Sequence, residues 1–454
     1  MHYFIKTFGC QMNISDSERI ASFLEAQKIK PTKDIEKADL VIFNTCGIRK
    51  SAEDRAFGQV HNIRKQEKKV AISKGAQAKK IIVLTGCMAN RKDVQKILKN
   101  KVDLFCEIKN FQDKIISVIA NTIKQSKNIG HNLTKNEIAV VTALPRSGNN
   151  YLSIDPKYSD KSSALVPIMT GCNNFCSYCV VPYARGREVS RPSKEILAEI
   201  KNLVKSGAKE ITLLGQNVNS YIDGKNNFPK LLELIEKIPG KFWINFISSH
   251  PKDFSDELID VIAKSKKICE HIHLPLQAGD DKILSKMNRK YTQKQYLDLI
   301  EKIKLAFTMN KPNTPYSITT DIIVGFPGET KKQFLESANV MTKVNYDMVF
   351  FGQFSLRPGT VAFNMKDNIS NFEKERREIF LNEILKKTNY ANNKQYIGKI
   401  LKVLVTKKDG ENYFGRTRTM KNVKLVSNKK NLVGKFINVK ITKANIWNLE
   451  AKIV

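Results

Sequence analysis

Apolar and amphipathic segments alternate along the first hundred residues. The apolar runs at residues 2–8, 38–44 and 81–85 have the length and composition of buried strands. Amphipathic segments follow them, and the first is predicted to be a helix that begins at the capping-box pattern of residues 15–18 and ends near Gln27. This alternation predicts an N-terminal doubly wound parallel sheet, in which ligands collect beyond the carboxyl ends of the strands.

A second and longer alternation follows. Helical patterns such as residues 193–207 and 292–307 separate most of the six predicted strands, which lie at residues 164–170, 209–217, 242–249, 271–277, 317–326 and 348–356. Six strand–helix units predict a central open (β/α)6 partial TIM-type barrel, and its chemistry is expected at the carboxyl ends of the strands.

The C-terminal part has a different period. After a charged helix at residues 371–395, short alternating strands are predicted at residues 399–407, 422–427, 435–444 and 449–454, with a turn at Asp409 and Gly410. This pattern predicts a small C-terminal β-barrel within an α/β protein. The expected organisation is a first domain at 1–120, a linker at 121–160 with an edge strand at 138–144, a core at 161–390 and the barrel at 391–454.

Composition narrows the class of protein. The 454 residues are 41% hydrophobic, which excludes a disordered, collagen-like or coiled-coil chain. The net charge of +33 points to a polyanionic partner, although a lysine-rich bias spread over the surface explains it equally well. No apolar run approaches the roughly 20 residues of a membrane span, and the N-terminal apolar stretch is too short for a signal peptide. We therefore expect a cytoplasmic protein with no membrane partner.

An aromatic and basic cluster at residues 413–418 lies in the predicted small barrel. It contains Tyr413, Phe414, Arg416 and Arg418. Exposed rings that stack on bases and cations that meet phosphates suit RNA. The alternative is that the two aromatic side chains belong to the core of the barrel.

Six of the eight cysteines form two groups. Cys10, Cys46 and Cys87 follow the first three predicted strands, so the topology can bring them to one metal centre. The second group, spaced by four and three residues directly after the first barrel strand, is Cys172, Cys176 and Cys179. Three thiolates at this spacing can ligate three irons of a cubane cluster and leave the fourth iron open, whereas a structural zinc site needs four ligands.

The remaining two cysteines, Cys106 and Cys269, lie outside both groups and are predicted to be buried, inert thiols. The open iron of the second group offers a binding position for the amino group and carboxylate of S-adenosylmethionine (SAM). An electron from the cluster would then break the sulfonium bond and give a 5′-deoxyadenosyl radical.

The segment at residues 172–179 resembles the CxxxCxxC signature of the radical SAM superfamily, and the chain resembles its methylthiotransferases in particular. The basic C-terminal barrel is similar to the TRAM domain of that family. The motifs that carry the resemblance are FGCQMN (8–13), NTCGIR (44–49), TGC (85–87), GCNNFCSYCVVPYARGREVSRP (171–192), LLGQNVNSY (213–221), SSHP (248–251), HLPLQAGD (273–280) and GFPGET (325–330).

The resemblance implies two [4Fe-4S] clusters together with SAM. Cys10, Cys46 and Cys87 would hold an auxiliary cluster with an open iron where sulfur is kept. FGCQMN is most similar to the bacterial branch that converts N6-isopentenyladenosine at position 37 of tRNA to its 2-methylthio derivative. The alternatives are the branches that act on threonylcarbamoyladenosine in tRNA or on a ribosomal protein, and an RNA-binding protein with purely structural clusters. The implied partners are the anticodon arm of tRNA and a low-potential electron donor such as flavodoxin or ferredoxin, and we expect a monomer.

Positions at the predicted strand ends are candidates for contact with SAM. They are Tyr178, Gly215, Gln216, Asn217, Gly325 and Phe326, although the glycines would also suit tight turns. Arg185, Arg187 and Arg191 follow the second cysteine group and either hold phosphate at the substrate mouth or form salt bridges. No histidine is assigned as a general base, because abstraction of a hydrogen atom by a radical needs none, and His273 is predicted to be structural. No catalytic side chain is assigned beyond the clusters.

Overall fold

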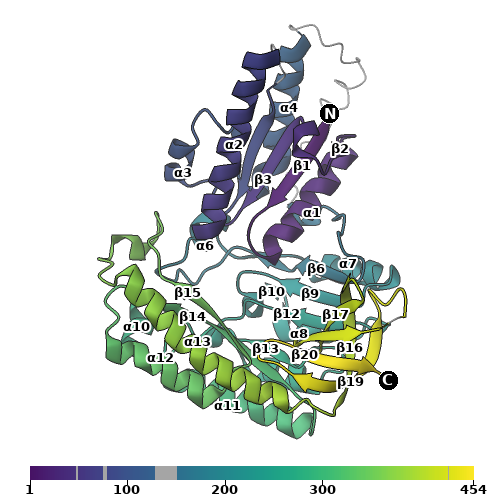
Figure 1. Ribbon diagram of the computed structural model, residues 1–454, viewed down its shortest axis with the longest axis vertical. Coiled ribbons are helices and arrows are strands. Elements are labelled where there is room, and N and C mark those ends of the chain that lie inside the picture. Colours follow the sequence, from purple (N-terminus) through teal and green to yellow (C-terminus); the bar gives the residue numbers. More distant parts are fainter. Residues whose placement is uncertain (48–49, 75–78, 128–150, 428) are drawn as a thin grey trace. The chain divides into compact units, whose positions relative to one another are not determined.

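The structure is a computed structural model that describes residues 1–47, 50–74, 79–127, 151–427 and 429–454. The chain forms two compact units, which are described separately (Figure 1). The first unit comprises Met1–Ser159 and Cys179–Arg187, and the second comprises Asp160–Tyr178 and Glu188–Val454.

The first unit contains a sheet of five parallel strands in the order β2-β1-β3-β4-β5. The bounds of these strands are His2–Thr7 for β1, Lys30–Pro31 for β2, Leu40–Thr45 for β3, Ile81–Gly86 for β4 and Leu104–Phe105 for β5. This strand order is that of an open doubly wound sheet whose switch point lies between β1 and β3. The predicted doubly wound parallel sheet is confirmed.

Helices cover both faces of this sheet. The helices α1 (Gln11–Ala26) and α4 (Phe111–Lys127) pack on one face, and α2 (Lys50–Lys74) and α3 (Lys92–Ile97) pack on the other. Apolar side chains of β3 and β4 alternate between the two core clusters, as the period of a strand requires. Short 3₁₀ segments lie at Ile35–Lys37, Ile108–Asn110 and Tyr151–Ser153.

The first helix begins earlier than predicted. Cys10 is the N-cap of α1, and the Asn13 side chain accepts a hydrogen bond from the Cys10 backbone N–H. Residues 15–18, the predicted start, lie inside the helix and are buried. Their polar side chains bond to other segments and do not cap the helix. Glu18, for example, forms hydrogen bonds with Ser159.

The predicted linker also begins too early, since residues 121–127 are the last turns of α4. Tyr151 and Leu152 are buried in the core of the first unit. The edge strand predicted at residues 138–144 lies outside the described residues.

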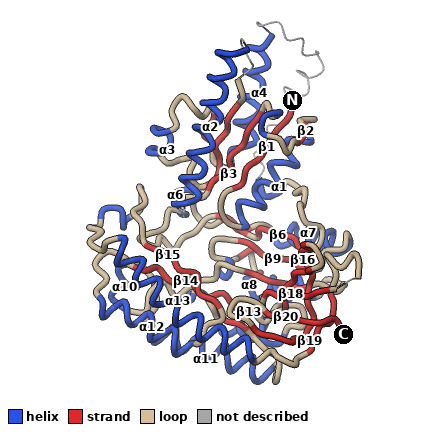
Figure 2. The backbone as a smooth tube through the Cα atoms, viewed as in Figure 1, coloured by secondary structure: helices blue, strands red, loops and turns tan. Residues whose placement is uncertain are grey.

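The second unit contains the six strands of the predicted open barrel. The parallel sheets β6-β9-β12 and β13-β14-β15 are joined by a parallel bridge between Ile244 and Ile268 (Figure 2). Because the strands follow one another in sequence order and do not close, this part of the fold is an open barrel, as predicted. The bounds are Ser163–Pro167 for β6, Glu210–Leu214 for β9, Trp243–Phe246 for β12, His271–His273 for β13, Ser317–Val324 for β14 and Met348–Gln353 for β15.

The helices of the second unit are α7 (Ser193–Lys205), α8 (Phe228–Glu236), α9 (Asp256–Lys264), α10 (Asp281–Lys286), α11 (Gln293–Asn310), α12 (Lys331–Val344) and α13 (Asn371–Lys394), and α6 (Val181–Arg185) belongs to the first unit. In the second unit α7 packs on α8, α8 on α9, α9 on α11, α11 on α12 and α12 on α13. Four two-residue strands complete the loops at Met169–Thr170 (β7), Val189–Ser190 (β8), Ile222–Asp223 (β10) and Asn226–Asn227 (β11). Within the described ranges, no helix is both long and apolar enough to cross a membrane.

The C-terminal strands close into a barrel in the order β16-β17-β18-β20-β19, which confirms the predicted small β-barrel. The bounds are Ile400–Asp409 for β16, Asn412–Thr417 for β17, Asn422–Val426 for β18, Phe436–Ala444 for β19 and Leu449–Ile453 for β20. The strand β17 was not predicted, although its buried and less buried positions alternate strictly. Gly410, with φ of +58°, makes the predicted turn before it.

The structure contradicts the prediction that Tyr413, Arg416 and Arg418 present a ring and cations to RNA. Phe414 is half-buried, and its part of the prediction is not contradicted. Tyr413 is fully buried in the barrel core, which confirms for this residue the alternative prediction of a core side chain. Arg416 pairs with the buried Glu210 at the start of β9. Arg418 donates to Glu270, at 2.7 Å from Nε and 2.8 Å from Nη2.

These ion pairs attach the barrel to the core of the second unit. Lys421 adds a contact of 2.8 Å with Asp347, and the Trp243 ring packs against Phe436 with centroids 4.6 Å apart. Burial would raise the pKa of Glu270, but its bonds with Arg418 outweigh that effect and lower it. Because burying a charge is costly unless it is paired, the barrel and core depend on one another for charge neutrality.

We predict that Arg418→Ala lowers the free energy of unfolding by about 3 kcal/mol, because it leaves Glu270 buried with one fewer partner. Urea unfolding at pH 7 measures the loss, and Lys402→Ala on the exposed side of β16 is the control. Folding lowers the pKa of Glu270, so the stabilisation that the Arg418–Glu270 pair provides is present at neutral pH. It disappears as the pH falls through the pKa of Glu270 in the folded protein. Equal stability of Arg418→Ala and the control would contradict this account of the interface.

Candidate metal centres and cofactor site

The first cysteine group lies on three neighbouring loops at the carboxyl edge of the parallel sheet. Cys10 follows β1, Cys46 follows β3 and Cys87 follows β4, and these three strands are adjacent. A Cβ atom at Gly9 would lie 2.8 Å from the Cβ of Cys46, and one at Gly47 would lie 3.4 Å from the Cβ of Cys87. The loops therefore approach so closely that a side chain at either glycine would enter the space beside a thiol.

Two buried asparagines hold these loops together. The Asn13 amide donates to Asn44 Oδ1 at 2.9 Å and to the Thr45 carbonyl at 3.1 Å. The Asn44 amide donates in return to the Asn13 carbonyl at 2.8 Å. Asn13 Oδ1 also lies 3.3 Å from the thiol of Cys10. This reciprocal network fixes the end of β3 against the start of α1, and thereby sets the separation of Cys10 and Cys46.

A buried arginine adds positive charge to this edge. Arg185 lies on α6 in the first unit, and its Nη2 donates to Asp16 Oδ2 at 2.6 Å. Burial opposes its charge, but Asp16 and Cys87 outweigh that effect and hold the pKa of the guanidinium well above its usual value. Although residue Cys10 is exposed, desolvation by the surrounding loops raises the pKa of its thiol, and nearby Cys87 adds to the rise while Arg185 opposes it. The thiols and the guanidinium therefore share one electrostatic environment.

In the second cysteine group, Cys172 and Cys176 lie on a loop of the second unit, and Cys179 opens the segment that belongs to the first unit. Gln216 Oε1 accepts a hydrogen bond from the Gly171 backbone at 2.6 Å, and Asn288 donates to the Phe175 carbonyl at 2.9 Å. Phe175 has a φ of +47°, so the loop is held in a conformation that non-glycine residues seldom adopt. Burial raises the pKa of Cys172.

A second buried arginine, Arg289, lies beside this loop. Its Nη1 is 3.4 Å from the sulfur of Cys176, its Nε donates to the Tyr291 hydroxyl at 2.9 Å, and its Nη2 donates to the Pro275 carbonyl at 3.1 Å. Arg289 could not be predicted as part of this site, because it is 113 positions from Cys176 and no spacing pattern connects the two. A fixed cation beside a thiolate favours the charged form of the sulfur.

The two thiol groups fit iron–sulfur clusters better than a mononuclear metal. Among the residues that the structure describes, no three His, Cys, Asp or Glu side chains converge on a point where one metal ion would bind. A cubane makes a different demand, because each thiolate binds a different iron. Sets of three soft sulfur donors, each with a buried guanidinium group nearby, are chemically suited to such a cluster.

Of the predicted SAM contacts, Gly215, Gln216 and Asn217 follow β9 at the mouth of the open barrel. Gln216 supports the cysteine loop, and a Cβ at Gly215 would lie 2.6 Å from the Met169 side chain. Asn217 donates to Asp253 at 2.7 Å, while its Oδ1 is buried and has no hydrogen-bond partner in the described part of the protein. An unpartnered buried acceptor at a strand end suits a polar ligand such as SAM.

The other three predicted contacts have different surroundings. Gly325 has a φ of +72°, and a Cβ there would lie 2.4 Å from the Lys374 side chain, so this glycine serves a tight turn. Phe326 is fully buried and packs edge-on against Phe354. Tyr178 is partly buried between the second and third cysteines of its loop.

The neighbouring arginines and histidines mostly have structural partners. Arg185 and Arg191 form buried salt bridges, the latter with Glu199 at 2.7 Å, whereas Arg187 is exposed. Burial lowers the pKa of His250 to about 2 and that of His271 to about 3, so both are neutral at physiological pH. His273 bonds to Thr319 at 3.0 Å and to Asp321 at 3.3 Å, as predicted for a structural side chain.

The two cysteines outside the groups are buried, as predicted. Cys106 packs in the core of the first unit, and burial raises its pKa to about 12. Cys269 packs with Trp243 and Leu404 where the barrel meets the core, and burial raises its pKa as well. Neither thiol is available as a ligand or nucleophile.

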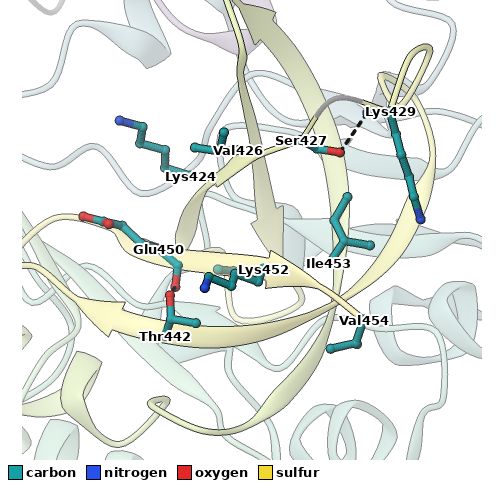
Figure 3. Close-up of a pocket in the computed structure, with 10 residues that line it drawn as sticks. Lys424, Val426, Ser427, Lys429, Thr442, Glu450, Lys452, Ile453 and Val454 are labelled. Carbon is teal, nitrogen blue, oxygen red and sulfur yellow. Dashed lines mark hydrogen bonds between the residues drawn. The ribbon is translucent and has the colours of Figure 1, made fainter.

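A basic face of the barrel lies over β18, β20 and β19. A cavity of about 520 Å³ is lined there by Lys424, Lys429 and Lys452, together with Glu450 (Figure 3). Lys440 lies directly opposite Lys452 in the register of β19 and β20. Like charges in a cross-strand pair repel one another, and an anion bound between the two lysines would relieve that repulsion.

Comparison with known families defines the class of protein. Residues 166–341 match the model of the radical SAM superfamily, residues 2–107 match that of the uncharacterized protein family UPF0004, and residues 394–454 match the TRAM domain. The chain is thus a radical SAM protein with a C-terminal TRAM domain, and radical SAM proteins use an iron–sulfur cluster and SAM.

Relatives define the family more closely. The chain is 41% identical to a tRNA-2-methylthio-N(6)-dimethylallyladenosine synthase of Thermoanaerobacter pseudethanolicus over 100% of its own length and 93% of that protein. It is 43% identical to a protein of the same name from Thermodesulfovibrio yellowstonii over 99% and 98% of the two chains. The chain belongs to this family of tRNA methylthiotransferases.

Solved structures agree with the fold. The radical SAM methyltransferase TsrM from Kitasatospora setae matches with a TM-score of 0.51 and 16% identity, over 80% of this chain and 77% of that one. The cobalamin-dependent SAM radical enzyme OxsB matches with a TM-score of 0.52 and 11% identity, over 85% and 56%. At these identities the comparison supports the α/β architecture alone.

Proposed function

We propose that this protein converts N6-isopentenyladenosine at position 37 of tRNA to its 2-methylthio derivative. The two relatives, which match this chain over 93% and 98% of their own lengths, are named as synthases of 2-methylthio-N6-dimethylallyladenosine in tRNA. The observation that carries the proposal is the presence of a second thiol group, Cys10, Cys46 and Cys87, on neighbouring strand ends in a unit separate from the radical SAM core. A radical SAM enzyme that only cleaves SAM has no need of it.

The proposed division of labour assigns one cluster to each thiol group. Cys172, Cys176 and Cys179 would hold the cluster that, when bound, supplies the electron for reductive cleavage of SAM. Arg289 keeps the Cys176 sulfur beside a fixed positive charge, and Asn217 Oδ1 offers an acceptor to SAM at the barrel mouth. The predicted contacts Tyr178, Gly215, Gln216, Gly325 and Phe326 would shape the SAM site, the glycines chiefly by allowing close approach.

The first thiol group would hold an auxiliary cluster where sulfur is kept. Asn13 and Asn44 fix the spacing of the loops that carry its ligands. Arg185 supplies positive charge at the same edge. A separate sulfur site suits a reaction whose product gains a carbon–sulfur bond that SAM cleavage alone does not provide.

The proposed order of domains is an auxiliary-cluster domain first, predicted at 1–120 and extended by α4 to Lys127, then the radical core at 161–390 and the tRNA-binding barrel from 391 onwards. The electron donor would be a small low-potential protein such as flavodoxin or ferredoxin. We expect a monomer that works in the cytoplasm, where tRNA is modified.

Replacing the two thiol groups separately tests the division of labour. The Cys10/Cys46/Cys87→Ala variant should still release 5′-deoxyadenosine with dithionite and SAM, yet make no methylthio-tRNA. The Cys172/Cys176/Cys179→Ala variant should yield neither product. Chromatography after anaerobic incubation measures both, and Cys106→Ala, which changes a buried thiol outside the groups, is the control. Methylthio-tRNA formation by the first variant would refute the proposed sulfur site.

The barrel is proposed to bind tRNA through the basic face over β18, β20 and β19, because Arg416 and Arg418 are occupied by the core. Replacing Lys424, Lys440 and Lys452 with Gln should weaken tRNA binding on the order of tenfold at low salt and reduce the salt slope by about one per lost phosphate contact. Fluorescence anisotropy with labelled tRNA across a salt series measures both.

The matched control replaces three lysines that are already paired within helices of the core, namely Lys230, Lys264 and Lys294. This control variant removes the same total charge and leaves the barrel unchanged. An equal effect of the two triple variants would mean that the charge of the chain acts without regard to position, and that the barrel face is not the binding surface.

A further inference from the structure

Arg185 has an unused hydrogen-bond donor at the edge that carries Cys10, Cys46 and Cys87. Its side chain is 3% exposed, and its Nη2 is occupied by Asp16. Its Nη1 is buried and has no hydrogen-bond acceptor in the part of the chain that the structure describes. A buried charged donor without a partner is costly, so such a group in a native protein usually has a ligand.

The groups that interact electrostatically with the guanidinium restrict the chemistry of this ligand. Asp16 bonds to it directly, and the thiols of Cys10 and Cys87 and the hydroxyl of Tyr151 act on it through their charge. Asp16 lies on α1 and is fully buried, so it balances one positive charge within the pair. Once the thiols serve as cluster ligands they are thiolates, and a further anion at this edge would be repelled unless a cation faced it.

We propose that Nη1 of Arg185 binds an anionic sulfur ligand, of the class of hydrosulfide or a small thiolate, at the three-cysteine edge. This inference rests on the proposed function, in which this edge keeps the sulfur that is transferred. The guanidinium suits the role because its charge is permanent and its donors lie in one plane, which the bond to Asp16 orients.

The other arginines after the second cysteine group do not offer this arrangement. Arg191 belongs to the second unit, where its Nη1 donates to Glu199 and to the Pro167 carbonyl. Arg187 is exposed two positions beyond Arg185, which makes it a matched control.

The test uses the full-length chain with Cys172, Cys176 and Cys179 replaced by Ala, so that any cluster signal comes from the first group. After anaerobic reconstitution, sodium hydrosulfide is titrated and the electron paramagnetic resonance spectrum of the reduced protein is followed. The double variant Asp16→Asn/Arg185→Gln removes both buried charges and keeps side chains that can bond to one another. It should raise the hydrosulfide midpoint on the order of tenfold or more.

Two further variants separate the guanidinium from its surroundings. Asp16→Asn keeps Arg185 and removes the opposing negative charge, so the midpoint should be unchanged or lower. Arg187→Gln should leave the midpoint unchanged. Iron analysis and circular dichroism accompany each titration and report whether the cluster and the fold are retained.

An unchanged midpoint in the double variant would overturn the inference. A folded double variant that has lost its iron would also overturn it, because Arg185 would then be needed for the cluster and not for sulfur. If the background protein with Arg185 intact holds no iron, the proposed auxiliary cluster itself is wrong and the inference falls with it. The iron content therefore distinguishes the two failures.

Discussion

The parallel register of β1, β3 and β4 is the constraint on which the proposed chemistry of the first unit depends. Adjacent parallel strands end at the same edge, so cysteines far apart in sequence arrive on neighbouring loops. Hydrogen bonds of the Asn13 and Asn44 amides then hold the loops together. The positions beside the thiols are glycines, because a larger side chain there would clash with the neighbouring loop. A shift of one residue in the register of β3 would turn Asn44 to the opposite face and break this network.

In the second unit, tertiary contacts determine which charged side chains are paired. The barrel uses Arg416, Arg418 and Lys421 to neutralise carboxylates of the core, and these cations are therefore not available to a polyanion. The lysines on β18, β19 and β20 have no such acidic partners in the core among the described contacts, and in the proposed function they meet the phosphates of tRNA. Part of the net charge of +33 thus docks the barrel on the core, and the proposal assigns another part to binding.

The sequence was sufficient for features that depend on local pattern. The apolar runs predicted β1, β3 and β4 and the six strands of the open barrel, and the cysteine spacing predicted the candidate cluster loop. It was not sufficient where the position or role of a residue depends on a contact with a residue distant in sequence. The polar residues 15–18 resemble a helix start but lie inside α1, because Asp16 and Glu18 have partners on distant segments. Arg289 and the docking role of Arg418 could not be predicted either, because their partners are distant in sequence.

The central claim is that each thiol group holds one [4Fe-4S] cluster. Mössbauer spectroscopy with iron analysis of the anaerobically reconstituted protein tests it most directly. The account predicts about eight irons per chain, all in cubane clusters, and about four in a variant that lacks either thiol group. About four irons in the unaltered protein, or a single bound zinc ion, would contradict it.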